Sequence, residues 1–226
     1  MRVLMFGWEF PPHIAGGLGT ACYGMTRGLA ENGVEVLFVM PSASGDEDQS
    51  SVRIINASDV AVDTMSETVD EFLGKVRFVH VGTNMVPYVS PEDFSSVVEE
   101  ERARQIKDFR ITYGQKYQFS GKYGTNLMEE VTRYGMVGGT IALQHCDEFD
   151  VIHAHDWLTY LAGIAAKQLT GKPLVVHVHA TSFDRSSDDN IDTRVYDLEK
   201  RGMEAADRVI TVSELTRNIV INKYGI

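Results

Sequence analysis

Strand patterns and helix patterns alternate along the last third of this chain, and this order constrains its fold more than any other feature. The apolar stretches 149–156, 173–180 and 207–213 have the length of buried strands, and each is followed by a segment with helical spacing. Gly171 and Ser213 stand where a helix would end and begin. Strands that alternate with helices of this length predict a parallel sheet with helices on both faces.

The first half of the chain continues the same pattern less regularly. Residues 3–7 and 34–40 read as buried strands on either side of a helix that runs from Thr20 to a terminating Gly33, while 52–57 and 76–82 are weaker strand patterns. Helices are expected near 91–110 and 126–146. We therefore predict one doubly wound α/β domain, Rossmann-like, with a mostly parallel sheet of about seven strands over residues 1–226.

Charge and composition exclude several classes of function. The chain has 21 Lys and Arg against 32 Asp and Glu, a net charge of −11, which argues against a nucleic-acid or anionic-membrane surface. No run of 18 apolar residues occurs, so no membrane span is expected. Cys22 and Cys146 fall in helix patterns, and we expect buried thiols in a reducing compartment rather than a disulfide. Cytoplasmic location is the expectation.

The loop after the first strand, within EFPPHIAGGLGTACYG (9–24), is long and rich in glycine. Gly16, Gly17 and Gly19 stand immediately before a helix, where free amides favour an anion or an oxygen-rich ligand, although a tight turn explains a glycine cluster equally well. A dinucleotide fingerprint fails, because Cys22 stands where glycine or alanine is needed and no acid ends the second strand. A phosphate-binding Gly-Lys-Ser/Thr motif is also missing.

Two histidine pairs, in HAHDW and HVHAT, lie where strands run into loops. They are His153 with His155 and His177 with His179. Three interpretations stay open: hydrogen bonds to loop backbone, a metal site of the amidohydrolase kind, and a neutral hydrogen-bonding group aimed at a polar substrate. The combination with Asp156 and Trp157 favours the third for His155.

The motifs EFPP…GGLG, FSGKYGTNL, DVIHAHDW and ADRVITVSELT occur in this order and span essentially the whole chain. Together they resemble the N-terminal domain of retaining glycosyltransferases of the GT-B fold, above all the bacterial and archaeal glycogen and starch synthases. The resemblance implies transfer of glucose or a related sugar from a nucleotide diphosphate sugar, ADP-glucose or UDP-glucose, to a glucan or other glycan. It implies no cofactor and no metal.

Site residues follow from the same resemblance. His155 matches the family's catalytic histidine, which hydrogen-bonds the transferred sugar, and Gly16 and Gly17 match the loop whose amides meet the donor. Gly19, in the same glycine cluster, is a further donor-binding candidate. Glu9 is expected either to contact a sugar hydroxyl or to hold the loop through a salt bridge. The remaining substrate-binding candidates are His13, Asp156, His179 and Tyr123.

One position departs from the family. Glycogen and starch synthases commonly carry a lysine in this loop to meet the donor phosphate, and here the residue is Ile14. This leaves the donor nucleotide open. Tyr117, Phe119 and Tyr123 either line an acceptor groove or anchor a long connection. Trp157 is expected in the core.

The resemblance also implies a second, nucleotide-binding domain that this chain does not contain, so we expect the 226 residues alone to fold but not to transfer sugar. Two alternatives remain: a non-catalytic sugar-binding domain, and a metal-dependent hydrolase that uses the His-x-His pairs.

Overall fold

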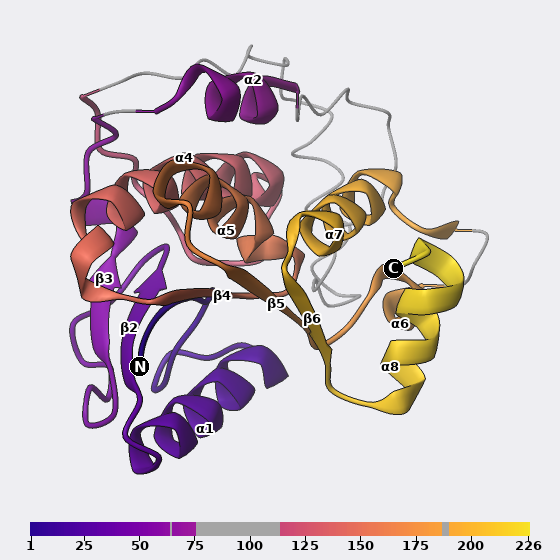
Figure 1. The fold of residues 1–226 in the computed structure, drawn as a ribbon, viewed down its shortest axis with the longest axis horizontal. Coiled ribbons are helices and arrows are strands. Elements are labelled where there is room, and N and C mark those ends of the chain that lie inside the picture. Colours follow the sequence, from indigo (N-terminus) through magenta and orange to yellow (C-terminus); the bar gives the residue numbers. More distant parts are fainter. Residues whose placement is uncertain (64, 76–113, 187–189) are drawn as a thin grey trace.

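The computed structural model describes residues 1–63, 65–75, 114–186 and 190–226. In this part of the chain one six-stranded sheet, in the order β3-β2-β1-β4-β5-β6, has only parallel neighbours (Figure 1). The strands are β1 (Arg2–Phe6), β2 (Glu35–Met40), β3 (Arg53–Asn56), β4 (Val151–His155), β5 (Leu174–Val178) and β6 (Arg208–Thr211). The predicted doubly wound α/β fold is confirmed.

Helices cover the two faces of the sheet unequally. Helix α1 (Gly17–Glu31) lies on one face, and α4 (Leu127–Gln144), α5 (Trp157–Thr170) and α7 (Thr193–Ala205) lie on the other (Figure 1). The shorter helices are α2 (Glu67–Lys75), α6 (Ser182–Arg185) and α8 (Glu214–Ile219), with 3-10 turns at Ala57–Asp59 and Cys146–Glu148 and a π-helical turn at Val220–Tyr224.

The alternation of side chains along β1 explains the two cores. Leu4 and Phe6 belong to the larger core, which α4, α5 and α7 share. Val3 and Met5 point to the opposite face and pack with Cys22 of α1 in a smaller core. Both cysteines are free, Cys22 buried and Cys146 partly buried.

Helices α4 and α5 approach each other closely because glycines face the contact. A Cβ atom at Gly138 would lie 2.6 Å from Cβ of Ala162, and one at Gly135 would lie 2.9 Å from Cβ of Leu161. Helix packing at such short range needs a residue without a side chain at the crossing. This pair of helices packs against the sheet face that includes β1 and β4 (Figure 1).

The predicted end of α5 and the predicted start of α8 are confirmed. Gly171, with φ of 70°, ends α5, and the Ser213 side chain accepts the Thr216 N–H at the start of α8. Helix α1 begins at Gly17, three residues earlier than the expected Thr20, because Gly17 and Gly19 already belong to its first turn. The predicted strand at 76–82 and helix at 91–110 lie outside the described residues.

Within the described segments, no helix combines the length and the apolarity that a membrane crossing requires.

Candidate functional site

The candidate site lies at the carboxyl ends of β1 and β4, where the order of the strands reverses. The chain moves from β1 outward to β2 and β3, then returns to β4 and continues to β5 and β6. The loops after β1 and β4 therefore diverge and leave a crevice, which is where open α/β sheets bind ligands. The glycine loop follows β1, and Asp156 with Trp157 follows β4.

Glu9 binds the backbone of the glycine loop. Its buried carboxylate accepts the N–H groups of Ala15 at 2.8 Å, Gly16 at 3.2 Å and Gly19 at 3.1 Å. A negative charge at the start of a helix is favourable, and this one occupies the place an external anion would take at α1. The loop is thus held by backbone hydrogen bonds rather than by the salt bridge considered for Glu9.

The three loop glycines have different surroundings. Gly19 is buried, and a Cβ atom there would lie 2.5 Å from Cγ2 of Ile14 and 2.9 Å from Cγ of Glu9. Gly17 is exposed, has nothing within 4 Å of a Cβ position, and its N–H is bound by none of the described groups. Of the three amides predicted to meet a donor, those of Gly16 and Gly19 are already bound to Glu9.

This difference predicts opposite results for two matched substitutions. Gly19→Ala is expected to lower the free energy of unfolding by about 1–3 kcal/mol, because the added methyl overpacks the Ile14–Glu9 contact. Gly17→Ala is expected to leave it unchanged or raise it slightly, because alanine favours a helix. Urea unfolding of the two variants checks this, and equal losses would contradict the assigned surroundings.

A cavity of about 490 Å³ opens beside the glycine loop. Glu9, His13 and Tyr123 line it, as does Ile14, and Lys122 adds a cation that the sequence analysis did not single out. His13 is exposed, and its Nε2 lies 2.8 Å from Oδ1 of Asp46. Lys122 lies within the FSGKYGTNL motif, but only the fold shows that it shares a cavity with Ile14.

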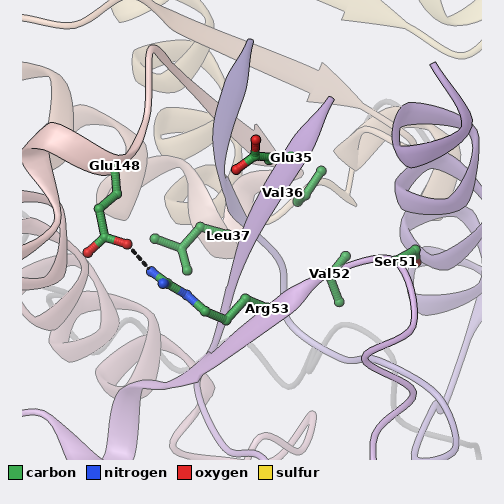
Figure 2. Close-up of a pocket in the computed structure, with 7 residues that line it drawn as sticks. All are labelled: Glu35, Val36, Leu37, Ser51, Val52, Arg53 and Glu148. Atoms are coloured by element: carbon green, nitrogen blue, oxygen red, sulfur yellow. Dashed lines mark hydrogen bonds and ion pairs between the residues drawn. The ribbon is translucent and has the colours of Figure 1, made fainter. Parts of the chain in front are cut away.

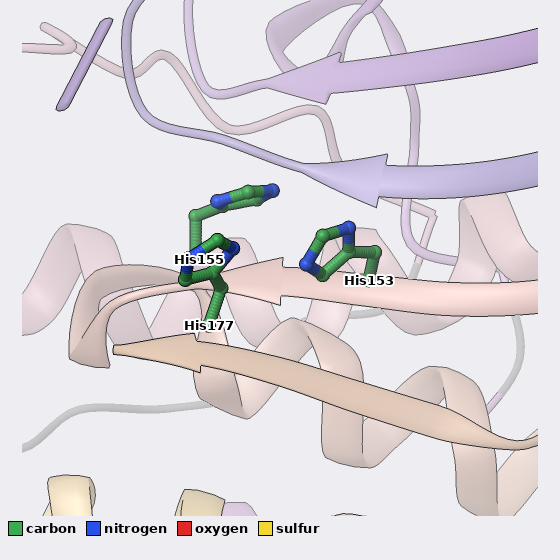
Figure 3. Close-up of side chains that lie close together, drawn as sticks. All are labelled: His153, His155 and His177. Atoms are coloured by element: carbon green, nitrogen blue, oxygen red, sulfur yellow. The ribbon is translucent and has the colours of Figure 1, made fainter. Parts of the chain in front are cut away.

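The four histidines of the two pairs come together on β4, β5 and the loop after β5. His155 is paired in register with His177, and His153 with Met5 of β1, so these rings stand on the face of the sheet that carries α1. Figure 3 shows the three rings together. Ring centroids lie 4.2 Å apart for His153 and His155 and 4.4 Å for His177 and His179. The two pairs thus form one cluster of neighbouring rings.

A hydrogen bond joins the two members nearest the loops. Nδ1 of His155 and Nε2 of His179 lie 2.9 Å apart. His155 is fully buried, whereas His179 is partly exposed, so His179 is the ring of this pair that meets the crevice.

Asp156 fixes this pair by joining the two loops. Its Oδ1 accepts the His179 N–H at 2.7 Å, and its own N–H donates to the carbonyl of His177 at 2.9 Å. Its φ of 58° with ψ of 169° is a conformation that non-glycine residues rarely adopt and that costs on the order of 1–3 kcal/mol. Asp156, predicted to bind substrate, is buried and engaged with backbone.

The electrostatics of the cluster keep its rings neutral. Burial lowers the pKa of His153 to about 3 and that of His179 to about 4, and it lowers the pKa values of His155 and His177 as well. Burial also raises the pKa of Asp156 to about 7. Near neutral pH these histidines therefore act as hydrogen-bonding groups or ligands and not as acids.

Two of the three aromatic residues expected either to line a groove or to anchor the connection are anchors. Tyr117 and Phe119 are buried in the larger core, and so is Trp157, as expected. Tyr123 is partly buried and lines the cavity beside Lys122, which keeps it among the substrate-binding candidates.

A second cavity, of about 310 Å³, lies at the amino ends of β2 and β3 (Figure 2). It is lined by the first residues of β2 and β3, and of its three charged residues, Arg53 and Glu148 pair with each other. It faces the amino ends of the strands, away from both glycine loop and histidines, so we do not assign it to the site.

Comparisons with known proteins found similar glycosyltransferases. The chain is 25% identical over 230 residues to an uncharacterized glycosyltransferase of Methanocaldococcus jannaschii and 24% identical over 228 residues to a glycogen synthase of Mycobacterium tuberculosis. Both alignments cover 100% of this chain but only 43% and 45% of the relatives, so the chain spans less than half of their length.

A solved structure has the same fold. The sucrose-phosphate synthase of Thermosynechococcus elongatus matches 97% of this chain and 44% of its own with a TM-score of 0.56 at 14% identity. The family model described as the starch synthase catalytic domain matches residues 2–225. The chain therefore belongs to the starch synthase catalytic domain family of glycosyltransferases.

Proposed function

We propose that this chain forms the acceptor-side half of a retaining glycosyltransferase that moves glucose or a related sugar from a nucleotide diphosphate sugar to a glucan. One observation supports this most: the glycine loop and the HDW segment, which belong to the family's motifs, flank the same crevice between β1 and β4. The nucleotide itself would bind to a further domain, for which the greater length of the relatives leaves room.

In this proposal His155 and His179 act as one unit. His179, which is partly exposed, donates or accepts a hydrogen bond at the transferred sugar, and His155 orients it through the 2.9 Å contact. Because both pKa values are lowered, the pair stabilises polar groups of the transition state without exchanging a proton.

Lys122 takes the part of the lysine that Ile14 replaces. It is exposed, lines the same cavity as Ile14, and forms no ion pair with the described residues. A lysine ammonium in this cavity would offset the charge of a donor diphosphate. Either ADP-glucose or UDP-glucose meets these requirements.

The test compares transfer of labelled glucose into glycogen by the 226-residue chain and by the natural gene product that contains it. We expect no transfer by the chain alone and transfer by the longer protein. In the latter, His155→Ala and His179→Ala should each lower kcat by about 10²–10³-fold. The double variant should be little worse than either single one. Lys122→Ala should chiefly raise KM for the donor, with Lys116→Ala, outside the cavity, as its control.

Two outcomes would overturn this proposal. Rapid transfer by the isolated chain would show that no second domain is needed. Binding of glucans without transfer from any nucleotide sugar, by the longer protein, would instead favour a sugar-binding role.

A further inference from the structure

Three buried imidazole nitrogens stand close together without any hydrogen-bond partner in the described part of the chain. They are Nε2 of His153, Nε2 of His155 and Nδ1 of His177, on rings that are 9%, 0% and 7% exposed. A buried polar atom without a partner is costly, and most such atoms in native proteins are satisfied. Three of them on two neighbouring strands suggest that something else satisfies them.

The arrangement of the rings is that of a ligand set. Each of the three histidines offers one ring nitrogen, Nδ1 or Nε2, that lies within 4.8 Å of the nitrogens offered by the other two. Figure 3 shows the rings gathered near the carboxyl ends of β4 and β5. Three nitrogens at about 2.0–2.1 Å from one tetrahedral ion would be about 3.3 Å apart. To bind one ion, the rings would therefore have to rotate about their side-chain bonds and bring these nitrogens closer together.

We propose that His153, His155 and His177 bind one divalent transition-metal ion of the Zn²⁺ or Co²⁺ type. Neutral imidazoles suit these ions, whereas Mg²⁺ and Ca²⁺ require oxygen ligands, which this group does not offer. The fourth position is left for a water molecule or another ligand. This inference does not depend on sugar transfer.

His179 completes the site from outside. If Nδ1 of His155 donates to Nε2 of His179 across the 2.9 Å contact, the lone pair of His155 resides on Nε2, where the ion would bind. A partner that fixes the tautomer of a metal-binding histidine is typical of such sites. His179 is thus a positioning residue here, and Asp156 holds it in place.

The test is a titration of the 226-residue chain with CoCl₂, followed by visible absorption, and then displacement by ZnCl₂. We expect one equivalent of Co²⁺ with the intense bands of a four-coordinate ion, and a higher melting temperature with Zn²⁺. His153→Gln and His177→Gln should each weaken binding by at least about tenfold. His145→Gln, which alters a histidine paired with Glu148 outside the cluster, should not.

Absence of four-coordinate bands in the wild-type chain, or equal affinity in the wild type and both cluster variants, would overturn the proposal. If circular dichroism shows that the cluster variants do not fold, the wild-type protein decides. One equivalent of Zn²⁺ should then shift the ¹⁵N NMR signals of His153, His155 and His177. Shifts confined to His13 or His145 would contradict the site.

Discussion

Lowering the pH from 7.5 to 4.5 is expected to remove several kcal/mol from the free energy of unfolding of this domain, measured with a chelator present. The unfolded chain binds protons at its histidines near pH 6.5, whereas burial holds the pKa of His153 at about 3 and that of His179 at about 4 in the folded state. Stability from these groups is therefore complete above pH 6.5 and is lost as the pH falls. At pH 4.5 each of the two has lost about 2–3 kcal/mol.

Asp156 opposes this loss but does not cancel it. Its pKa is raised to about 7 in the folded state, so the native protein gains about 3 kcal/mol from this group as the pH falls from 7 to 4.5. His153 and His179 together lose about 5 kcal/mol over the same range, and His155 and His177 add to the loss. Because the loss from the histidines is larger than the gain from Asp156, the free energy of unfolding is expected to fall as the pH falls.

Urea unfolding at several pH values distinguishes these contributions. His153→Gln should flatten the pH dependence, and Asp156→Asn should steepen the loss on the acid side. His145→Gln serves as the control, because this residue lies outside the cluster. A free energy of unfolding that stays constant between pH 7.5 and 4.5 would show that the cluster is not buried as described.

The alternation of strands and helices was sufficient to predict the sheet, because parallel strands buried on both faces leave a continuous apolar pattern. The same pattern placed HAHDW and HVHAT at strand ends, but the meeting of the two pairs follows from the register of β4 and β5, in which His155 lies opposite His177. Which ring is exposed could not be predicted, since it depends on the loop that Asp156 ties to β5 through the His179 N–H.

The position of Lys122 in the cavity beside the glycine loop also could not be predicted from the sequence. It follows a long connection whose path depends on the burial of Phe119 and on the Glu130 carboxylate, which accepts the Ser120 N–H at 3.1 Å. Neither contact has a signature in the spacing of residues. The occupation of loop amides by Glu9 was missed for the same reason, because a carboxylate six to ten residues before the amides that it binds has many available partners.

Glu9→Ala is expected to lower the free energy of unfolding by about 3 kcal/mol, with its effect centred on the glycine loop. The substitution deprives three backbone N–H groups of a charged acceptor, and such bonds are worth about 1.5–3 kcal/mol each. The N–H groups of Ala15 and Gly16 are on exposed residues, where water replaces the carboxylate. Gly19 is buried, so its N–H bears most of the cost.

Two comparisons make this prediction specific to the loop. Glu9→Gln keeps one acceptor oxygen and should therefore lower the free energy of unfolding by about half as much. The remaining loss arises because its NH₂ group faces backbone donors. Glu47→Ala is the matched control, since Glu47 is also buried and accepts the N–H groups of Ser44 and Gly45, but in a loop that starts no helix. Hydrogen exchange at the Gly19 amide should accelerate in Glu9→Ala and remain slow in Glu47→Ala. Unchanged exchange at Gly19 in Glu9→Ala would mean that the loop is held by other contacts, and its amides would then be free to bind a donor.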